Sequence, residues 1–152
     1  MDLKLLDTLT QTFGPSGYED RIRAAILKET ETLADEFRVD PLGSLVLHKR
    51  GSSDGKRVMI AAHMDEIALM VTHIEETGYA RFTSIGGLRH INYVGGRARF
   101  ADGTIGTIYV ERRDDATTVP GLQHLFIDVG APDRDHCPVH VGDTAIFEGP
   151  LY

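Results

Sequence analysis

The hydrophobic and polar positions predict two helices at the start of the chain. Leucines recur every third residue between residues 3 and 9, which gives one apolar stripe of a helix. After a break at Gly-Pro-Ser-Gly, apolar residues return at helical spacing and predict a second helix from about residue 18 to residue 34. Ser16 and Glu19 have the spacing of a capping box, in which the serine hydroxyl accepts a backbone N–H of the first turn and the glutamate reaches back.

From residue 36 the spacing changes to the two-residue period of β-strands. Residues 37–39 and 45–47 alternate on either side of a Pro-Leu-Gly turn, so we expect a hairpin there. Residues 57–62 (Arg-Val-Met-Ile-Ala-Ala) do not alternate, which predicts a strand apolar on both faces in the middle of a covered sheet. A further apolar strand is expected at residues 67–71.

Beyond about residue 72 the helical spacing largely disappears, and short strand-like segments are separated by Gly-Gly, Thr-Gly and Asp-Gly turns. Many short strands at this spacing are typical of a small β-barrel or sandwich. We therefore predict an α/β fold in two parts, an α/β unit from residue 1 to about 71 and a β-barrel unit from about 72 to 148. The expected strands of the second unit are Arg97–Phe100, Thr104–Val110, Leu125–Val129 and Thr144–Phe147.

Composition limits the partners and the compartment. The chain has 152 residues, with 16 Lys and Arg against 23 Asp and Glu, and a formal net charge of −7. Binding to nucleic acid or to an anionic membrane depends on clustered Lys and Arg, so this balance argues against both. The apolar runs are far shorter than the roughly 20 residues of a membrane helix, and the start of the chain lacks the apolar segment of a signal peptide. The single cysteine, Cys137, excludes an internal disulfide and fits a reducing, cytoplasmic setting.

The clearest candidate for chemistry is His63-Met-Asp65-Glu66, which follows the expected buried strand at residues 57–62 directly. Ligands of open α/β sheets bind outside the carboxyl ends of the strands. In extended backbone, residues two apart point to the same side, so His63 and Asp65 can face one cavity. A carboxylate that accepts a hydrogen bond from one ring nitrogen can steer the other toward a metal ion. The alternative is a polar cap on a strand end, with His63 simply hydrogen-bonded.

A second group of polar residues runs from Asp133 to His140 and contains imidazole, thiol and carboxylate groups, all of which can bind zinc. Its spacing matches no ligand pattern, and we interpret it as a solvated loop. Cys137 stands beside a proline there, and nothing marks it as a nucleophile. The remaining histidines are scattered and are interpreted as surface or structural residues.

Six motifs in order resemble one known family. They are Gly14-Pro-Ser-Gly-Tyr-Glu19, Asp40-Pro-Leu-Gly43, Ala62-His-Met-Asp-Glu-Ile-Ala-Leu-Met-Val71, Ile85-Gly-Gly87, Leu125-Phe-Ile-Asp-Val-Gly-Ala131 and Val141-Gly-Asp143. Together they resemble the tetrahedral (TET) aminopeptidases, dinuclear metallopeptidases of the glutamyl or deblocking type whose relatives are sometimes labelled endoglucanases. The resemblance implies part of an α/β catalytic domain, interrupted by a PDZ-like β-barrel used for oligomerisation, with residues 149–152 starting the return to the catalytic domain.

The resemblance also implies roles for particular residues. It makes His63 a metal ligand and Asp65 the catalytic-site residue beside it, while Glu66 receives no role in metal binding. A complete site would hold two divalent ions, zinc or cobalt, and this chain would hold at most one of them weakly, because the remaining ligands and the general base belong to a part of the family fold beyond residue 152. The implied partners are peptide substrates and further copies of the chain, in a dimer or a larger TET-like assembly. The sequence departs from the family pattern mildly at Ser44 and Ala68, and more strongly after Val110.

Two hypotheses follow. In the first, the chain is an incomplete and inactive N-terminal part of a metal-dependent aminopeptidase. In the second, it is a non-catalytic oligomerisation or peptide-binding module derived from that family, because the β-unit is complete while the active site is not.

Overall fold

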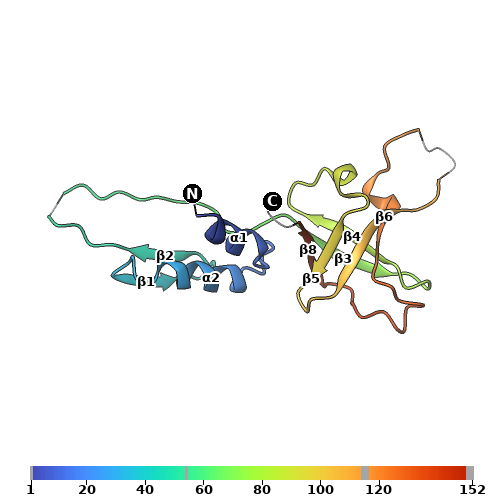
Figure 1. Ribbon diagram of the computed structural model, residues 1–152, viewed down its shortest axis with the longest axis horizontal. Coiled ribbons are helices and arrows are strands. Elements are labelled where there is room, and N and C mark those ends of the chain that lie inside the picture. Colours follow the sequence, from blue (N-terminus) through green and yellow to red (C-terminus); the bar gives the residue numbers. More distant parts are fainter. Residues whose placement is uncertain (1, 54, 114–116, 150–152) are drawn as a thin grey trace. The chain divides into compact units, whose positions relative to one another are not determined.

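The computed structural model describes residues 2–53, 55–113 and 117–149, so residues 150–152 of the expected return to the catalytic domain lie outside it (Figure 1). The chain forms two compact units, Met1–Asp65 and Glu66–Tyr152. This division comes six residues earlier than the boundary expected from the sequence. The reason is that the apolar strand expected at residues 67–71 pairs with strands of the second unit and not with the first.

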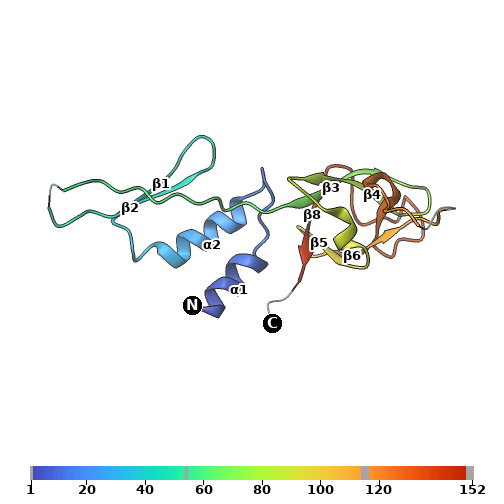
Figure 2. The ribbon, with the colours of Figure 1, turned by 90° about the horizontal axis from the view of Figure 1, so that it is seen from above.

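The first unit begins with two helices, α1 (Leu3–Gln11) and α2 (Asp20–Thr30), which contact each other (Figure 2). Asp2 caps α1, because its Oδ1 accepts the backbone N–H groups of Lys4 and Leu5 at 2.9 and 3.2 Å. Both helices were expected, although α2 is shorter than the predicted span. The longer of the two has 11 residues, and no helix among the described residues is long and apolar enough to cross a bilayer.

The predicted capping box is wrong. The residue before α2 is Glu19, and no side chain caps the helix there. The Glu19 carboxylate accepts the backbone N–H of Gly17 at 2.6 Å. The Ser16 hydroxyl donates to Asp65 instead, a partner 49 residues away. Local spacing could not reveal this competing partner, because the sequence separates the two residues so widely.

The expected hairpin is present, formed by β1 (Glu36–Val39) and β2 (Leu45–His48) with Phe37 opposite Leu47. Its turn is fixed by Asp40, whose Oδ1 accepts the backbone N–H groups of Leu42 and Ser44, both at 2.9 Å. The turn also contacts the helix, since Arg23 Nε donates to the carbonyl of Gly43 at 2.9 Å.

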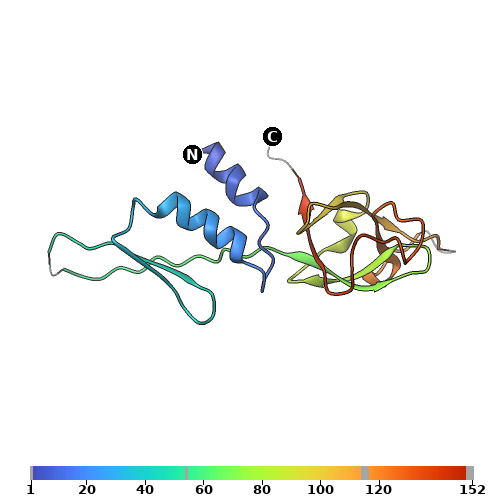
Figure 3. The same cartoon turned by 90° about the horizontal axis from the view of Figure 1, so that it is seen from below.

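The strand predicted at residues 57–62 is absent, which corrects the sequence analysis. The segment is a plain trace without ladder partners among the described residues (Figure 3). Its apolar side chains lie in solvent, with Val58 84%, Met59 88% and Ile60 93% exposed. A run that is apolar on both faces becomes a strand only when neighbouring strands pair with it and layers cover it, and the described residues provide neither.

The second unit is a closed six-stranded barrel in the order β3-β4-β7-β6-β5-β8, with every pairing antiparallel. Its strands are β3 (Ala68–Ile74), β4 (Ala80–Ile85), β5 (Arg97–Phe100), β6 (Ile105–Val110), β7 (Leu125–Asp128) and β8 (Thr144–Glu148), with 3-10 helices η1 (His90–Tyr93) and η2 (Leu122–His124) between them. The sequence predicted the segments of all except β4. The barrel, the hairpin and the two helices together confirm the predicted α/β fold with a β-barrel unit.

Alternating side chains fill the barrel, as the two-residue period requires. The largest of those wholly buried in the barrel are Val71, Leu69, Ile108, Leu125, Ile127 and Ile146. Two aromatic stacks complete the packing, Tyr79 on Phe126 with ring centroids 4.4 Å apart and Tyr93 on Phe147 at 3.9 Å. The second unit therefore has a core of its own.

Candidate active site

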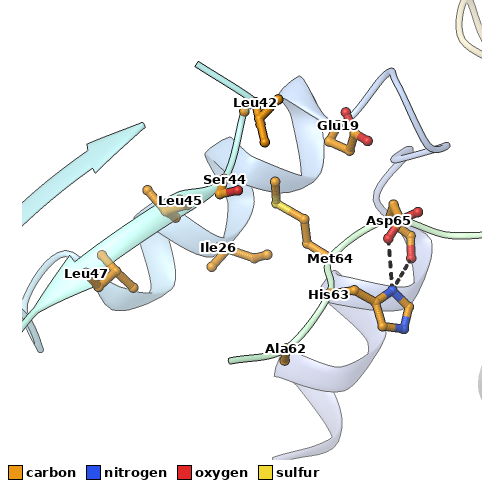
Figure 4. A pocket seen from close by; sticks show the side chains of 11 residues that line it. Glu19, Ile26, Leu42, Ser44, Leu45, Leu47, Ala62, His63, Met64 and Asp65 are labelled. Atoms are coloured by element: carbon orange, nitrogen blue, oxygen red, sulfur yellow. Dashed lines mark hydrogen bonds and ion pairs between the residues drawn. The ribbon is translucent and has the colours of Figure 1, made fainter. Parts of the chain in front are cut away.

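An open cleft of about 390 Å³ lies in the first unit, between α2, the hairpin and the segment Ala62–Asp65. Figure 4 shows Met64 pointing toward the apolar side chains of the cleft, while His63 and Asp65 lie together on the other side of the backbone. The apolar side chains of the lining are those of Ile26, Leu42, Leu45, Leu47, Ala62 and Met64. Polar side chains, those of Glu19, Ser44, His63 and Asp65, complete the lining. The volume falls within the usual range of small-molecule sites.

The structure brings the two predicted site residues into contact. His63 Nδ1 lies 3.0 Å from Asp65 Oδ1 and 3.0 Å from the Asp65 carbonyl oxygen. The ionised carboxylate and the carbonyl are both acceptors only, so Nδ1 carries the ring hydrogen. The lone pair of the neutral ring then lies on Nε2, which points away from Asp65 (Figure 4). The His63 side chain is 85% exposed and that of Asp65 37%, so a ligand can reach this nitrogen.

Asp65 is held from both sides. Ser16 donates its hydroxyl hydrogen to Oδ2, and His63 Nδ1 faces Oδ1. These two hydrogen bonds, that of Ser16 first, hold the pKa of the Asp65 carboxyl below its usual value. The group is therefore a carboxylate at neutral pH, as an acceptor for the imidazole must be.

The donor set does not amount to a two-metal centre. Within residues 2–53, 55–113 and 117–149, no three His, Cys, Asp or Glu side chains lie where they could hold one ion together. A two-metal site needs several ligands to fix both ions about 3.5–4 Å apart. The described part of the cleft thus offers fewer than three such side chains to any one ion, and Nε2 of His63 is a nitrogen there that a ligand can reach.

The polar group from Asp133 to His140 does not converge. His136 Nδ1 pairs with Asp133 Oδ1 at 2.7 Å and both side chains are exposed, whereas Cys137 is half-buried against the barrel core. Arg134 ties the segment to the barrel by donating from Nε to the carbonyl of Ile74 at 2.8 Å. The segment is a loop, as interpreted from the sequence.

Sequence reasoning missed two groups of residues. The spacing predicts a helix cap for Ser16, whereas the tertiary structure gives its hydroxyl Asp65 as partner. His124 has no spacing signal in the sequence, yet its Nδ1 lies 2.6 Å from Glu111 Oε1 in a network with Arg81. Arg81 also donates to the carbonyls of Gln123 and Leu125, so the network fixes η2 and β7 to β4 and is structural.

The family model and the curated protein that match this chain are both described as aminopeptidases. A family model described as M42 glutamyl aminopeptidase matches residues 43–152. A curated protein of Acetivibrio thermocellus, provisionally named an aminopeptidase, is 40% identical over 147 residues, which cover 95% of this chain and 44% of that protein.

Solved structures agree with the sequence matches. An aminopeptidase from the archaeon Desulfurococcus kamchatkensis superposes with a TM-score of 0.88 at 34% identity, covering 98% of this chain and 44% of that one. The TET1 peptidase of Pyrococcus horikoshii, described as able to assemble into a tetrahedron or a large octahedral shell, gives a TM-score of 0.82 at 30% identity, with 96% and 46% covered. The chain spans less than half the length of these relatives.

Proposed function

Because the chain belongs to the M42 glutamyl aminopeptidase family, we propose that it supplies a metal ligand, His63, to the active site of a metal-dependent aminopeptidase. Such an enzyme removes residues from the N-termini of peptides. The observation that supports this role is the ring geometry, in which Asp65 occupies Nδ1 while Nε2 points away from that carboxylate at the edge of an apolar cleft. A metal-bound histidine characteristically has this arrangement, with its second nitrogen held by a carboxylate.

Asp65 acts on the imidazole in this proposal. Its carboxylate keeps the hydrogen on Nδ1 and fixes the plane of the ring, which directs the Nε2 lone pair. His63 would contribute one ligand to a complete site with two divalent ions, zinc or cobalt, and these ions would supply polarisation of the scissile carbonyl and a water of lowered pKa. One imidazole holds one ion weakly at best, so the 152-residue chain by itself is expected to be inactive.

A chimera tests the role of His63. Residues 1–152 replace the matching segment of the Desulfurococcus kamchatkensis aminopeptidase, which superposes over 98% of this chain. Turnover of aminoacyl-p-nitroanilides is then measured for the chimera and for two variants, His63→Ala and His136→Ala. His136 is a matched control, because it is also exposed and its Nδ1 also faces a carboxylate, that of Asp133.

We expect the chimera to be active, His136→Ala to leave its rate unchanged, and His63→Ala to lower it more than 100-fold, since even outer-shell partners of metal ligands are typically worth about 10–100-fold. Turnover that survives His63→Ala would refute the role. Robust turnover by the 152-residue chain alone, with added zinc or cobalt, would refute its expected inactivity.

The same proposal assigns assembly to the barrel. The TET1 peptidase of Pyrococcus horikoshii is described as forming a tetrahedron or an octahedral shell, and we extend self-association to this chain as a homo-oligomer. Exposed apolar side chains on the barrel, Tyr109 and Val141 among them, supply surface for such contacts. The expected location is the cytoplasm, where a free thiol such as Cys137 persists.

A second candidate, a non-catalytic module, is favoured by one observation, the complete core of the barrel unit. For such a module, assembly is the better assignment than peptide binding by strand addition, because the barrel closes on itself and strand addition needs an open sheet edge. The chimera bears on both candidates, since turnover that depends on His63 shows a site still competent for catalysis, whereas a folded but inactive chimera favours the module.

A further inference from the structure

The Ser16 hydroxyl is the second support of the site. It lies in the turn between α1 and α2 and donates to Oδ2 of Asp65. The other carboxylate oxygen, Oδ1, lies 3.0 Å from His63 Nδ1. A single carboxylate thus joins a hydroxyl from residue 16 to an imidazole at residue 63.

The turn that carries Ser16 is fixed by packing. A Cβ on Gly14 would lie 2.5 Å from Cγ2 of the buried Ile22, so only glycine allows this approach. Pro15 is fully buried, and its carbonyl accepts the N–H of Tyr18 at 2.8 Å. Gly17 follows with a φ of +86°, a backbone conformation that glycine adopts readily.

Of the two acceptors 3.0 Å from Nδ1, the Asp65 carbonyl oxygen is part of the backbone, whereas the carboxylate is a side-chain group. The hydroxyl matters because this carboxylate is otherwise able to turn. Asp65 is 37% exposed and His63 85% exposed, so packing alone does not hold either group. A carboxylate bonded at one oxygen only can rotate about its Cβ–Cγ bond, whereas one held at both oxygens keeps a single orientation. With Oδ2 held by Ser16, Oδ1 stays directed at Nδ1.

We propose that Ser16 is a positioning residue for His63, which acts through Asp65 to keep the ring hydrogen on Nδ1 and the Nε2 lone pair available. The purpose of that orientation, binding a metal ion, rests on the proposed function. The orientation itself is a property of the metal-free chain. A helix cap, the role predicted from the sequence, would leave the His63 ring unaffected.

The experiment measures the ring tautomer in the metal-free 152-residue chain. Long-range ¹⁵N–¹H correlation spectra, recorded at a pH at which the ring is neutral, give the ratio of the Nδ1–H to the Nε2–H form of His63. We expect Nδ1–H to dominate in the wild type. Ser16→Ala should lower the ratio about threefold or more, a smaller change than the 10–100-fold in affinity typical of a partner bonded directly to a metal ligand.

Matched variants separate the hydroxyl from the shape of the side chain. Ser16→Thr and Ser16→Val have nearly the same shape and differ in the hydroxyl, so the first should keep the wild-type ratio and the second should lose it. Ser52→Ala changes an exposed serine on the loop at residues 51–53 and should change nothing. If Ser16→Ala fails to fold, the comparison of Ser16→Thr with Ser16→Val still shows whether the hydroxyl controls the tautomer.

The proposal is overturned if Ser16→Thr and Ser16→Val give the same ratio, or if Ser52→Ala changes it as much as Ser16→Ala. Adding Zn²⁺ to the wild type tests the proposed function separately. A His63 Nε2 signal that does not move at any Zn²⁺ concentration counts against metal binding by this chain, while the comparison of tautomers stands unaffected.

Discussion

Replacing Gly106 by alanine should overpack the barrel. A Cβ at Gly106 would lie 2.4 Å from Cγ2 of Ile127 and 3.0 Å from both the carbonyl oxygen of Asp128 and Cγ1 of Val129. Ordinary contacts begin near 3.4 Å, so the Ile127 methyl must move by about 1 Å, and Ile127 is wholly buried. Inserting a carbon into a packed core costs typically 1–3 kcal/mol, and the nearby backbone oxygen places this substitution at the upper end, about 2–3 kcal/mol.

The loss is large enough to measure by thermal unfolding. For a unit of 60–100 residues, 1 kcal/mol at the midpoint corresponds to about 4–8 °C, so the barrel should melt about 10–20 °C lower. Near-ultraviolet circular dichroism reports on this unit, because the stacks of Tyr79 on Phe126 and Tyr93 on Phe147 both lie in it. Gly87→Ala is the control, since a Cβ there meets nothing within 4 Å and the residue has no positive φ.

A double-mutant cycle identifies the cause. Ile127→Ala removes the methyl that the new Cβ would strike and is itself destabilising, by about 2–5 kcal/mol. In that background Gly106→Ala should cost at least about 1 kcal/mol less than in the wild type, because the shortest contact is gone while those with the Asp128 carbonyl oxygen and Val129 Cγ1 remain. The reasoning is wrong if Gly106→Ala costs the same in both backgrounds, or no more than Gly87→Ala.

Two further predictions concern charge and exposed apolar surface. Hydrogen bonds, that from His124 first and then that from Arg81, hold the pKa of Glu111 below its usual 4.5. A carboxyl whose pKa is lowered by folding stabilises the fold at pH values above its unfolded-state pKa, and this stabilisation is lost as the pH falls through its folded-state pKa. The urea concentration at which half of the barrel is unfolded should therefore decrease when the pH is lowered below 4.5. The decrease should be smaller in Glu111→Gln, and equal pH profiles of the wild type and this variant would contradict the prediction. The exposed apolar side chains of segment 57–62 should drive association of the chain. Replacing its three most exposed apolar residues by serine should therefore lower the average mass measured by light scattering. A wild-type chain that is already monomeric would contradict this prediction. The three residues are Val58, Met59 and Ile60.

Local chemistry made most of the fold predictable. The hairpin follows from alternation and from the turn residues Asp40 and Gly43, which act within a few positions of each other. The strands β5, β6, β7 and β8 lie between glycine turns and alternate in the same way. The hairpin and these strands depend on residues close in sequence, so the pattern of apolar and polar positions is sufficient to predict them.

The failures share one cause, which is dependence on distant partners. The segment 57–62 has the composition of a buried strand, but a strand exists only when another strand pairs with it, and periodicity carries no information about that. Ser16 fits a helix cap by spacing, and the choice between Glu19 and Asp65 as partner is decided by tertiary structure. The contact between His63 and Asp65 was predictable, because side chains two residues apart in extended backbone point to the same side.

Burial is distributed unequally between the two units, and this determines how each responds to mutation. Among the described residues up to 65, the buried apolar side chains are those of Phe13, Pro15 and Ile22, whereas the barrel buries a continuous core. Since large losses of stability come from cavities and overpacking in cores, substitutions in the barrel act mainly on folding. The cleft beside His63 is open and its apolar wall faces solvent, so substitutions there act mainly on what binds. A variant that lowers aminopeptidase activity in the chimera without lowering barrel stability therefore points to the first unit.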